Sequence, residues 1–309
     1  MRPDAHLFFR GKQLVVFGAG YVGVELIRQA LALGLPATAL TRNPTRAAEL
    51  SAMGAKTIVA DLATDQWHGQ IPGGADFVLD CVGAGGGGVD GYRRTYVDGL
   101  RSIFAWAATA PVGTFVYTSS TSVYPQSGGT KVTEDAPTLG VRDTAQVLVE
   151  AEDVVRALGG DACRRWFILR LAGLYGPGRH QILDQLRAGA TALHGPGDQH
   201  LNLIHRDDVC AAIWAAFAAP AAIGQLVFNV ADDGAATRAA LADWLAVRLG
   251  RPPPRFTGEP STSGRRITPD RIVVNERLKA TLGWRPNFPT FREGFRDPKT
   301  YGADEISIL

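Results

Sequence analysis

The sequence has few cysteines, almost no net charge and no long apolar run. Its three cysteines, Cys81, Cys163 and Cys210, form no C-x-x-C pair, so neither a disulfide framework nor a metal site is expected. The formal net charge is +2, from 32 basic and 30 acidic residues scattered along the chain. A nucleic-acid-binding protein needs a face dense in lysine and arginine. We therefore expect no nucleic-acid partner.

Membrane and secretion signals are also missing. The most apolar stretch covers only residues 210–223 and contains Pro220, which makes it too short to cross a bilayer. Residues 1–13 carry Asp4, His6 and two arginines where a secretion signal would have an apolar segment. We therefore expect a cytoplasmic protein that does not contact a membrane.

What the chain does have is a regular alternation of short apolar strands with amphipathic helices. The expected strands are residues 14–17, 37–40, 57–60, 77–82, 114–118 and 166–171. The expected helices among them are residues 21–33, 45–53, 92–110 and 143–158. This alternation is typical of β-α-β units, so it predicts an α/β fold with a doubly wound parallel sheet of the Rossmann type.

The strongest local signal is a G-x-G-x-x-G turn, Gly18-Ala19-Gly20-Tyr21-Val22-Gly23. It leaves the first expected strand and opens the first helix. In that context the first glycine makes the tight turn, the second lets a pyrophosphate approach the backbone, and the third lets helix and strand pack closely. Free N–H groups at the helix start add positive potential. The turn therefore predicts a dinucleotide site.

The end of the second strand indicates which dinucleotide binds. An acid there bonds the ribose 2′-OH of NAD, whereas an arginine accommodates the 2′-phosphate of NADP. This chain has Arg42 and no acid, and a charge-assisted bond contributes about 1.5–3 kcal/mol. NADP(H) is therefore favoured over NAD(H), unless Arg42 is only a solvated loop residue. Asp61, after the third strand, either accepts a hydrogen bond from the adenine amino group or caps the next turn.

The regular alternation ends near residue 171, which predicts a second, smaller unit. We assign residues 10–172 to the NAD(P)-binding Rossmann domain, with a return segment at about residues 201–219. A smaller α/β substrate-binding lobe is expected to comprise residues 173–200 and 220–296, and residues 297–309 are expected to form a tail.

Seven ordered blocks resemble one family, the extended short-chain dehydrogenases/reductases of the NAD-dependent epimerase/dehydratase superfamily. The blocks are the glycine turn, Asp61-Leu62, residues 118–124, Leu169-Arg170 with residues 175–178, residues 202–205 with 207–209, Asn229, and residues 282–286. The run from Leu169 to His180 resembles the atypical YeeZ-like branch in particular. The resemblance covers roughly residues 12–296.

The resemblance implies an active cleft between the sheet and the lobe, at the carboxyl ends of the strands. Ser120 falls at the family's catalytic serine, whose hydroxyl would bond a substrate carbonyl or alcohol. The alternative is a serine that only satisfies backbone groups at the strand end. Beside the three glycines, Arg42 and Asp61, cofactor contacts are expected at Tyr21, Val22, Leu62 and Leu171.

The family's proton relay, Tyr-x-x-x-Lys, is missing. None of the seven tyrosines is followed by a lysine four residues later. Aligning the helix at residues 143–158 by Glu150 puts Arg142 in place of the tyrosine and Gln146 in place of the lysine. An arginine cannot donate a proton near neutral pH, whereas Gln146 can still bond a ribose hydroxyl of the cofactor.

Four groups are candidates for the missing catalytic role. Tyr124 lies close to Ser120 in sequence, although its usual family role is packing and cofactor contact. His180 follows a glycine-proline loop and titrates in a useful range. Arg142 would bind an anionic substrate group or stabilise an oxyanion. His205 is the last candidate, although a structural role on a strand is the stronger expectation for it.

Two classes of function remain open. The first is an NAD(P)(H)-dependent oxidoreductase that exchanges hydride with a small-molecule carbonyl, imine or enone, with a non-redox epimerase or dehydratase as its variant. The second is a catalytically silent NADP(H)-binding sensor. Relatives pair through the helices at residues 92–110 and 143–158, so a homodimer is expected by analogy. The apolar side chains on the second helix would equally suit this subunit's own sheet: Val147, Leu148, Val154 and Val155.

Overall fold

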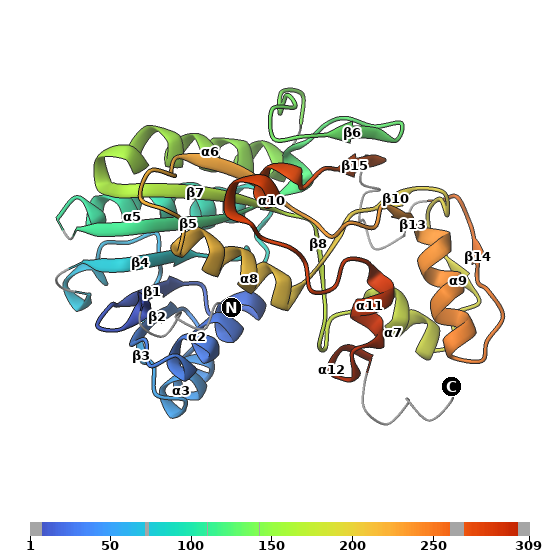
Figure 1. Cartoon of the computed structure of the whole chain (residues 1–309), viewed down its shortest axis with the longest axis horizontal. Helices are drawn as coiled ribbons and strands as arrows, with labels where there is room; N and C mark the ends of the chain where they lie inside the picture. The colour runs from blue at the N-terminus through green and yellow to red at the C-terminus, as the bar shows by residue number, and fades with distance from the viewer. Residues whose placement is uncertain (1–7, 72–73, 110, 142, 260–268, 302–309) are drawn as a thin grey trace.

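A computed structural model describes residues 8–71, 74–109, 111–141, 143–259 and 269–301. Its centre is a seven-stranded parallel sheet in the order β12-β7-β5-β4-β1-β2-β3, seen on the left of Figure 1. The strands are β1 (Leu14–Phe17), β2 (Ala37–Thr41), β3 (Lys56–Val59), β4 (Ala75–Asp80), β5 (Val112–Ser120), β7 (Cys163–Leu171) and β12 (Leu226–Val230). The predicted α/β fold of the Rossmann type is confirmed.

Helices cover both faces of the sheet because the central strands are apolar on both sides. In β1, Leu14 and Val16 enter one core, and Val15 and Phe17 enter the other. A parallel strand that is covered by helices on both faces needs apolar side chains on both of its sides. The first core lies under α2 (Tyr21–Ala32), α3 (Pro44–Ala52) and α8 (Arg206–Phe217), and the second lies under α5 (Gly99–Ala107) and α6 (Asp143–Ala162).

The apolar side chains of α6 pack within this chain. Val147 and Val155 are buried in the second core, Leu148 is buried in the first, and Val154 packs against the second. The four side chains therefore contribute to this subunit's own cores, with Val154 only partly buried.

The helix expected at residues 92–110 starts and ends earlier than predicted, at 88 and 107, and it is irregular. It begins with α4 (Gly88–Tyr92), continues through η2 (Arg93–Asp98) and ends as α5. The middle segment is π-helical. Such segments are rare and often lie at functional sites, because the wider turn redirects side chains.

A smaller lobe lies beside the carboxyl ends of the strands (Figure 1). Its helices, α7 (Gln181–Arg187), α9 (Arg238–Arg248), α11 (Phe291–Arg296) and α12 (Pro298–Tyr301), enclose a third core. Four pairs of short strands lie outside the main sheet: β8 (Gly173–Tyr175) with β11 (Leu203–His205), β6 (Thr130–Val132) with β15 (Arg271–Val273), β9 (Ala192–Leu193) with β14 (Arg255–Phe256), and β10 (His200–Leu201) with β13 (Ala236–Thr237). The remaining elements are η1 (His68–Gln70), η3 (Thr121–Val123) and α10 (Glu276–Leu282). Within the part of the chain that the structure describes, no helix is long and apolar enough to span a membrane.

The domain boundaries differ from the prediction at two places. Residues 220–296 were assigned to the lobe, but β12 lies in the main sheet and pairs with β7. Leu278 and Trp284 also pack in the first core. The reason is burial, since Phe228 and Val230 of β12 are fully enclosed and need the sheet beside them. The expected tail begins as helix α12, and its Tyr301 is buried in the third core.

Candidate functional site

A pocket opens at the point where the order of the strands in the sheet reverses. β1 lies between β2 and β4, so the chain crosses over to opposite sides of β1. Open α/β sheets bind ligands at such a point, beyond the carboxyl ends of the strands. The pocket has a volume of about 370 Å³. We call it the glycine-turn pocket, and its lining is Gly18, Ala19, Gly20, Leu40, Thr41, Arg42, Asn43, Asp61, Leu62, Ala63, Val82, Gly83, Arg94 and Thr95.

The three glycines of the turn serve three different purposes. Gly18 has φ +100°, and a Cβ there would lie 2.6 Å from the Val82 backbone nitrogen. A Cβ at Gly23 would lie 2.1 Å from the Gly18 carbonyl oxygen, so this glycine permits the close packing of α2 on β1. A Cβ at Gly20 would meet no atom within 4 Å, and Gly20 lines the pocket. The second glycine therefore leaves space for a ligand.

The start of α2 suits an anion. Gly20 is the N-cap, and it has no side chain that could cap the free N–H groups of the first turn. These N–H groups and the helix dipole attract negative charge. The turn thus fits the pyrophosphate of a dinucleotide, with Val22 buried behind it.

The end of β2 presents a cation to the pocket. Arg42 is exposed and lines it. Its neighbour Asn43 is occupied as the N-cap of α3, where the side-chain oxygen accepts a hydrogen bond from the Arg46 N–H at 3.1 Å. The strand end has no acid that would bond a ribose 2′-OH, as the sequence indicated.

Asp61 lies in the same pocket with both of its oxygens engaged. Oδ1 accepts a hydrogen bond from the Ala63 N–H at 3.1 Å, so the residue caps the turn. Oδ2 accepts from Nη2 and Nε of Arg94 at 2.8 and 3.2 Å. Although burial pushes the pKa of Asp61 upward, the Ala63 N–H and the Arg94 guanidinium hold it below its ordinary value. Leu62 lines the pocket beside it.

Ser120 ends β5 and lies opposite Leu171 of β7. Its side chain is half-buried, and its Oγ accepts a hydrogen bond from the Ser122 N–H at 3.1 Å. Because this bond uses an oxygen lone pair, the hydroxyl hydrogen is still available to a ligand. Leu171 itself is buried.

A buried polar network supports Ser120 from inside the protein. Ser119 donates a hydrogen bond to Glu152 at 2.7 Å, and Arg170 donates two more to Glu152 at 2.9 and 2.7 Å. Arg170 also donates to the Tyr124 hydroxyl at 2.8 Å, and Tyr124 donates to Asn229 at 2.7 Å. Burial would raise the pKa of Glu152, but Arg170 keeps it lower than usual.

Tyr124 is a structural member of this network. Its side chain is fully buried, its proton goes to Asn229, and its oxygen accepts from Arg170. Burial raises its pKa despite the nearby guanidinium. A hydroxyl with both functions occupied and no exposure cannot pass a proton to a substrate.

The two glutamates of α6 point in different directions. Glu150 is partly exposed and pairs with Arg93 at 2.6 Å, whereas the side chain of Glu152 is 1% exposed and pairs with Arg170. If the helix is aligned by Glu152 instead of Glu150, the positions of the relay tyrosine and lysine move two residues along the chain. They then fall on Thr144 and Leu148. Neither side chain transfers a proton near neutral pH.

The alignment by Glu150 points to Gln146 and Arg142. Gln146 has an exposed side chain. Arg142 lies outside the described residues. The inward face of α6 repeats at 147, 148, 151, 152 and 155, and this helical spacing is the signal that would have selected Glu152.

His180 lies on a loop that contacts the glycine turn. A Cβ at Gly176 of this loop would be 2.9 Å from the Tyr21 hydroxyl, and the Arg179 guanidinium lies 5.6 Å from the centre of the Tyr21 ring. The side chain of His180 is 9% exposed, and its Nδ1 lies 2.8 Å from Oδ1 of Asp184. Burial raises the pKa of Tyr21 to about 12, so this phenol stays neutral.

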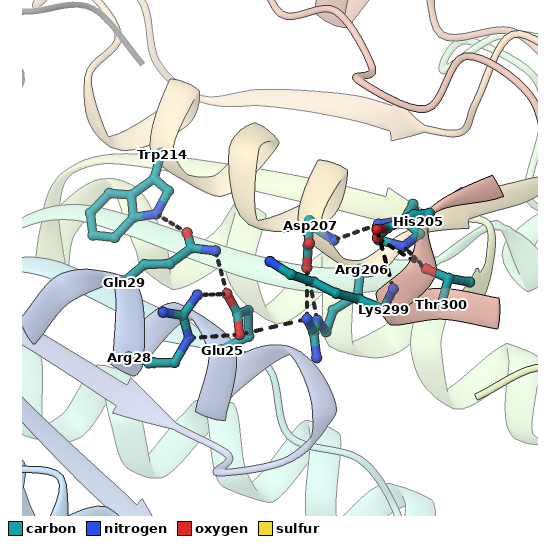
Figure 2. A network of polar contacts seen from close by, with 10 residues as sticks. Glu25, Arg28, Gln29, His205, Arg206, Asp207, Trp214, Lys299 and Thr300 are labelled. Carbon is teal, nitrogen blue, oxygen red and sulfur yellow. Dashed lines mark hydrogen bonds and ion pairs between the residues drawn. The ribbon is translucent and has the colours of Figure 1, made fainter. Parts of the chain in front are cut away.

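A second polar network links helix α2 to helix α8 and, through it, to helix α12, as Figure 2 shows. Trp214 donates to Gln29 at 2.8 Å, and Gln29 donates to Glu25 at 2.8 Å. Glu25 also lies 3.6 Å from Arg206 at the start of α8.

The same network continues from α8 to α12. His205 accepts a hydrogen bond from the Asp207 N–H at 3.2 Å, and its Nε2 lies 2.9 Å from the Thr300 hydroxyl. The His205 side chain is fully buried, and burial lowers its pKa. It therefore acts as a neutral structural residue.

Two buried carboxyl groups lie near the strand ends. Asp80 ends β4, and burial raises its pKa to about 7. Asp232 follows β12 and lines a second pocket of about 430 Å³, together with Asp233 and Lys279. Burial raises the pKa of Asp232 to about 8. Each carboxyl group therefore keeps its proton well above the ordinary range.

Comparison with known proteins agrees with this geometry. The model of the NAD dependent epimerase/dehydratase family matches residues 14–231. Protein YeeZ of Escherichia coli (strain K12) is 29% identical over 282 residues, which cover 90% of this chain and 97% of that protein. The 2-alkyl-3-oxoalkanoate reductase of Stenotrophomonas maltophilia (strain K279a) is 28% identical over 220 residues, covering 67% of this chain and 66% of the reductase.

A solved structure shows the same fold at greater sequence distance. MoeE5 in complex with UDP-glucuronic acid and NAD superimposes with a TM-score of 0.80 at 21% identity, covering 95% of this chain and 100% of that one. The family match extends over more than half of the sequence and includes the glycine turn, Ser120 and β12. This chain therefore belongs to the NAD-dependent epimerase/dehydratase family.

Proposed function

We propose that the protein is an NADP(H)-dependent oxidoreductase that exchanges hydride with a small-molecule carbonyl, imine or enone. One observation carries this proposal. The glycine-turn pocket combines an uncapped helix start with Arg42 at the end of β2, where no acid is present. One of the reductases among the relatives acts on an oxoalkanoate according to its name, which supports a carbonyl substrate.

Residues of the pocket would hold the cofactor by position. Gly18, Gly20 and the first turn of α2 would bind the pyrophosphate, and Arg42 would bind the 2′-phosphate. Leu62 would contact the adenine. When bound, the nicotinamide supplies or takes up a hydride at the substrate carbon.

Ser120 would orient and polarise the substrate. Its hydroxyl hydrogen is free while Oγ is fixed by the Ser122 N–H, so it can donate to a carbonyl oxygen or an imine nitrogen. A positioned donor of this kind is worth about 10²–10³ in rate. The network of Glu152 and Arg170 below it keeps β5 in place.

The proton itself would come from His180 or from water. Asp184 engages Nδ1 of His180, so Nε2 is the ring nitrogen that would serve as the donor. A general acid contributes about 10²–10⁴ in rate. Substrates that need little protonation, such as an iminium or a conjugated enone, therefore suit a site without the tyrosine and lysine.

Calorimetric titration with NADPH and with NADH tests the proposal. We expect NADPH to bind more tightly, and Arg42→Ala to weaken NADPH binding by roughly tenfold to a hundredfold. Arg46→Ala is the matched control, because Arg46 lies on the neighbouring α3 and pairs with Glu49 outside the pocket. Binding of neither nucleotide would refute the proposal.

A catalytically silent NADP(H) sensor is the second candidate. Two observations favour it. The Tyr124 hydroxyl is fully used in hydrogen bonds to Asn229 and Arg170, and Thr144 and Leu148 cannot act as an acid. Ser120→Ala separates the two functions. An oxidoreductase loses turnover on a substrate found by screening carbonyls and imines with NADPH. A sensor shows no nucleotide-dependent turnover in that screen, and the substitution leaves its nucleotide binding unchanged.

A further inference from the structure

A second arginine, which no sequence motif singled out, lines the glycine-turn pocket. Arg94 lies on the π-helical segment η2, and its side chain is 57% exposed. It reaches into the pocket and donates two hydrogen bonds to the same oxygen of Asp61. Arg94 is 33 residues from Asp61 in sequence, so only the fold brings them together.

The charged groups that line this pocket are Arg42, Asp61 and Arg94. Together they carry a net charge of +1. The 2′-phosphate of NADP adds close to two negative charges, which one arginine neutralises only in part. The carboxylate of Asp61 in the same pocket would repel the phosphate further unless its own charge is compensated. Arg94 supplies that compensation.

Arg94 also has donors to spare. A guanidinium carries five N–H donors in a planar fork that matches phosphate geometry. The bonds to Asp61 come from Nη2 and Nε, and the side chain as a whole is 57% exposed, so the N–H groups of Nη1 are not used by Asp61. Asp61, in contrast, is fixed by the Ala63 N–H.

We propose that Arg94 is a second ligand of the cofactor 2′-phosphate, that Asp61 holds it in the pocket before the cofactor binds, and that the pair sets the discrimination between NADPH and NADH. This inference rests on the proposed NADP(H) function and adds a specificity-determining pair to it. Arg42 approaches the phosphate from the end of β2, and Arg94 approaches it from η2. Asp61 is then a positioning residue, because it acts through Arg94.

The neighbouring arginine provides a matched control. Arg93 lies on the same π-helical segment, is 46% exposed and also pairs with a carboxylate, Glu150 of α6. It does not line the glycine-turn pocket. Arg93→Ala therefore removes a comparable ion pair from the same segment without changing the charge of the pocket.

The experiment is a calorimetric titration of the full chain with NADPH, NADH and 2′,5′-ADP. The last probe carries the 2′-phosphate but no nicotinamide, so its binding is independent of turnover. For Arg94→Ala we expect NADPH and 2′,5′-ADP to bind roughly tenfold more weakly or worse, with NADH changed by less than about twofold. Arg94→Lys should retain part of the preference, because it keeps the charge but loses the fork.

Asp61→Asn tests the positioning role, because an amide no longer forms the ion pair that holds the Arg94 guanidinium in the pocket. NADPH and 2′,5′-ADP should therefore bind severalfold more weakly, with NADH changed by less than about twofold, and unchanged or tighter NADPH binding would refute the positioning role. Arg93→Ala should leave all three affinities within about twofold. Equal weakening of NADPH and NADH in Arg94→Ala would mean that the arginine acts on the adenine, and this result would overturn the inference.

The failure of this inference can be told from the failure of the proposed function. If Arg42→Ala weakens NADPH and Arg94→Ala does not, the function stands and the second phosphate ligand is refuted. If the unmodified protein binds neither nucleotide, both are refuted. Thermal melting of each variant, compared with Arg93→Ala, shows whether a lost affinity reflects a folding defect.

Discussion

Arg170 on β7 holds Glu152 on α6 through two hydrogen bonds inside the protein, at 2.9 and 2.7 Å. The two side chains are 3% and 1% exposed. Glu152 also accepts a hydrogen bond from the hydroxyl of Ser119, the residue next to Ser120. The ion pair therefore joins a helix and two strands directly behind the proposed catalytic serine.

Breaking this pair should be costly. Arg170→Met leaves the Glu152 carboxylate buried without its main partner, so the free energy of unfolding should fall by about 3–5 kcal/mol. Arg156 contacts the same carboxylate from the surface at 2.8 Å with 37% exposure, and Arg156→Ala should cost at most about 1 kcal/mol. Urea unfolding followed by circular dichroism measures both. Equal losses would contradict the distinction between buried and exposed pairs.

The second and third glycines of the turn should separate binding from stability. Gly23→Ala places a Cβ against the Gly18 carbonyl, and the forced shift should cost about 1–3 kcal/mol of stability. Gly20→Ala meets no atom and should cost at most about 1 kcal/mol, because alanine is a poorer N-cap. Its methyl group occupies ligand space, so nucleotide binding should weaken strongly. Melting curves and titrations on both variants test this, and a stable Gly23→Ala would count against it.

Ser120 and Tyr124 should respond in opposite ways. Ser120→Ala should lower kcat/KM by about 10²–10³, because it removes a donor to the substrate, and should leave stability nearly unchanged. Tyr124→Phe should cost about 1–3 kcal/mol of stability, because Arg170 and Asn229 lose a buried partner, with turnover changed only a fewfold. Steady-state kinetics beside urea unfolding measures the two effects. A large kinetic loss in a fully stable Tyr124→Phe would restore tyrosine as the acid.

Asp80 and Asp232 should make the protein less stable as the pH rises. In the folded state burial raises their pKa values to about 7 and about 8, against an ordinary 3.8. Between about pH 4 and pH 8 the folded state therefore holds protons that the unfolded state has released. The stability contributed by these protons is complete below pH 4 and is lost as the pH rises through the folded pKa values.

Neutral substitutions should remove this dependence. Asp80→Asn and Asp232→Asn should each flatten the fall of unfolding free energy between pH 5 and pH 9, relative to the unmodified chain. Urea midpoints at the two pH values provide the measurement. Asp76→Asn, at the exposed position within β4, serves as a control. An unchanged slope in both buried variants would show that the two carboxyl groups ionise normally.

The sheet was predictable as far as local pattern determines it. The strands predicted at 14–17, 37–40 and 166–171 follow from apolar runs between helices of regular length, and the structure has them at 14–17, 37–41 and 163–171. β12 was placed in the lobe because it comes after the regular alternation has ended. Its pairing with β7 joins residues about 60 positions apart, and no local pattern carries that information.

The site was predictable where chemistry and spacing coincide. The glycine turn, Arg42 and Asp61 line one pocket, and motif context was enough to select them. Arg94 was missed because its role depends on a π-helical turn and a partner 33 residues away. Glu150 was chosen over Glu152 because the family pattern was counted without the helical period, which places Glu152 on the inward face.

The late position of β12 in the chain has a consequence for biosynthesis. β7 has β5 as a neighbour on one side, but its other edge is covered only by β12, which is complete at residue 230 of 309. Until the ribosome has released that segment, the nascent chain presents an unpaired strand edge and part of an uncovered apolar face. Such edges are templates for aggregation. The seven-stranded sheet can therefore be completed only late in translation. Until then, the exposed edge of β7 is the part that a chaperone would need to protect.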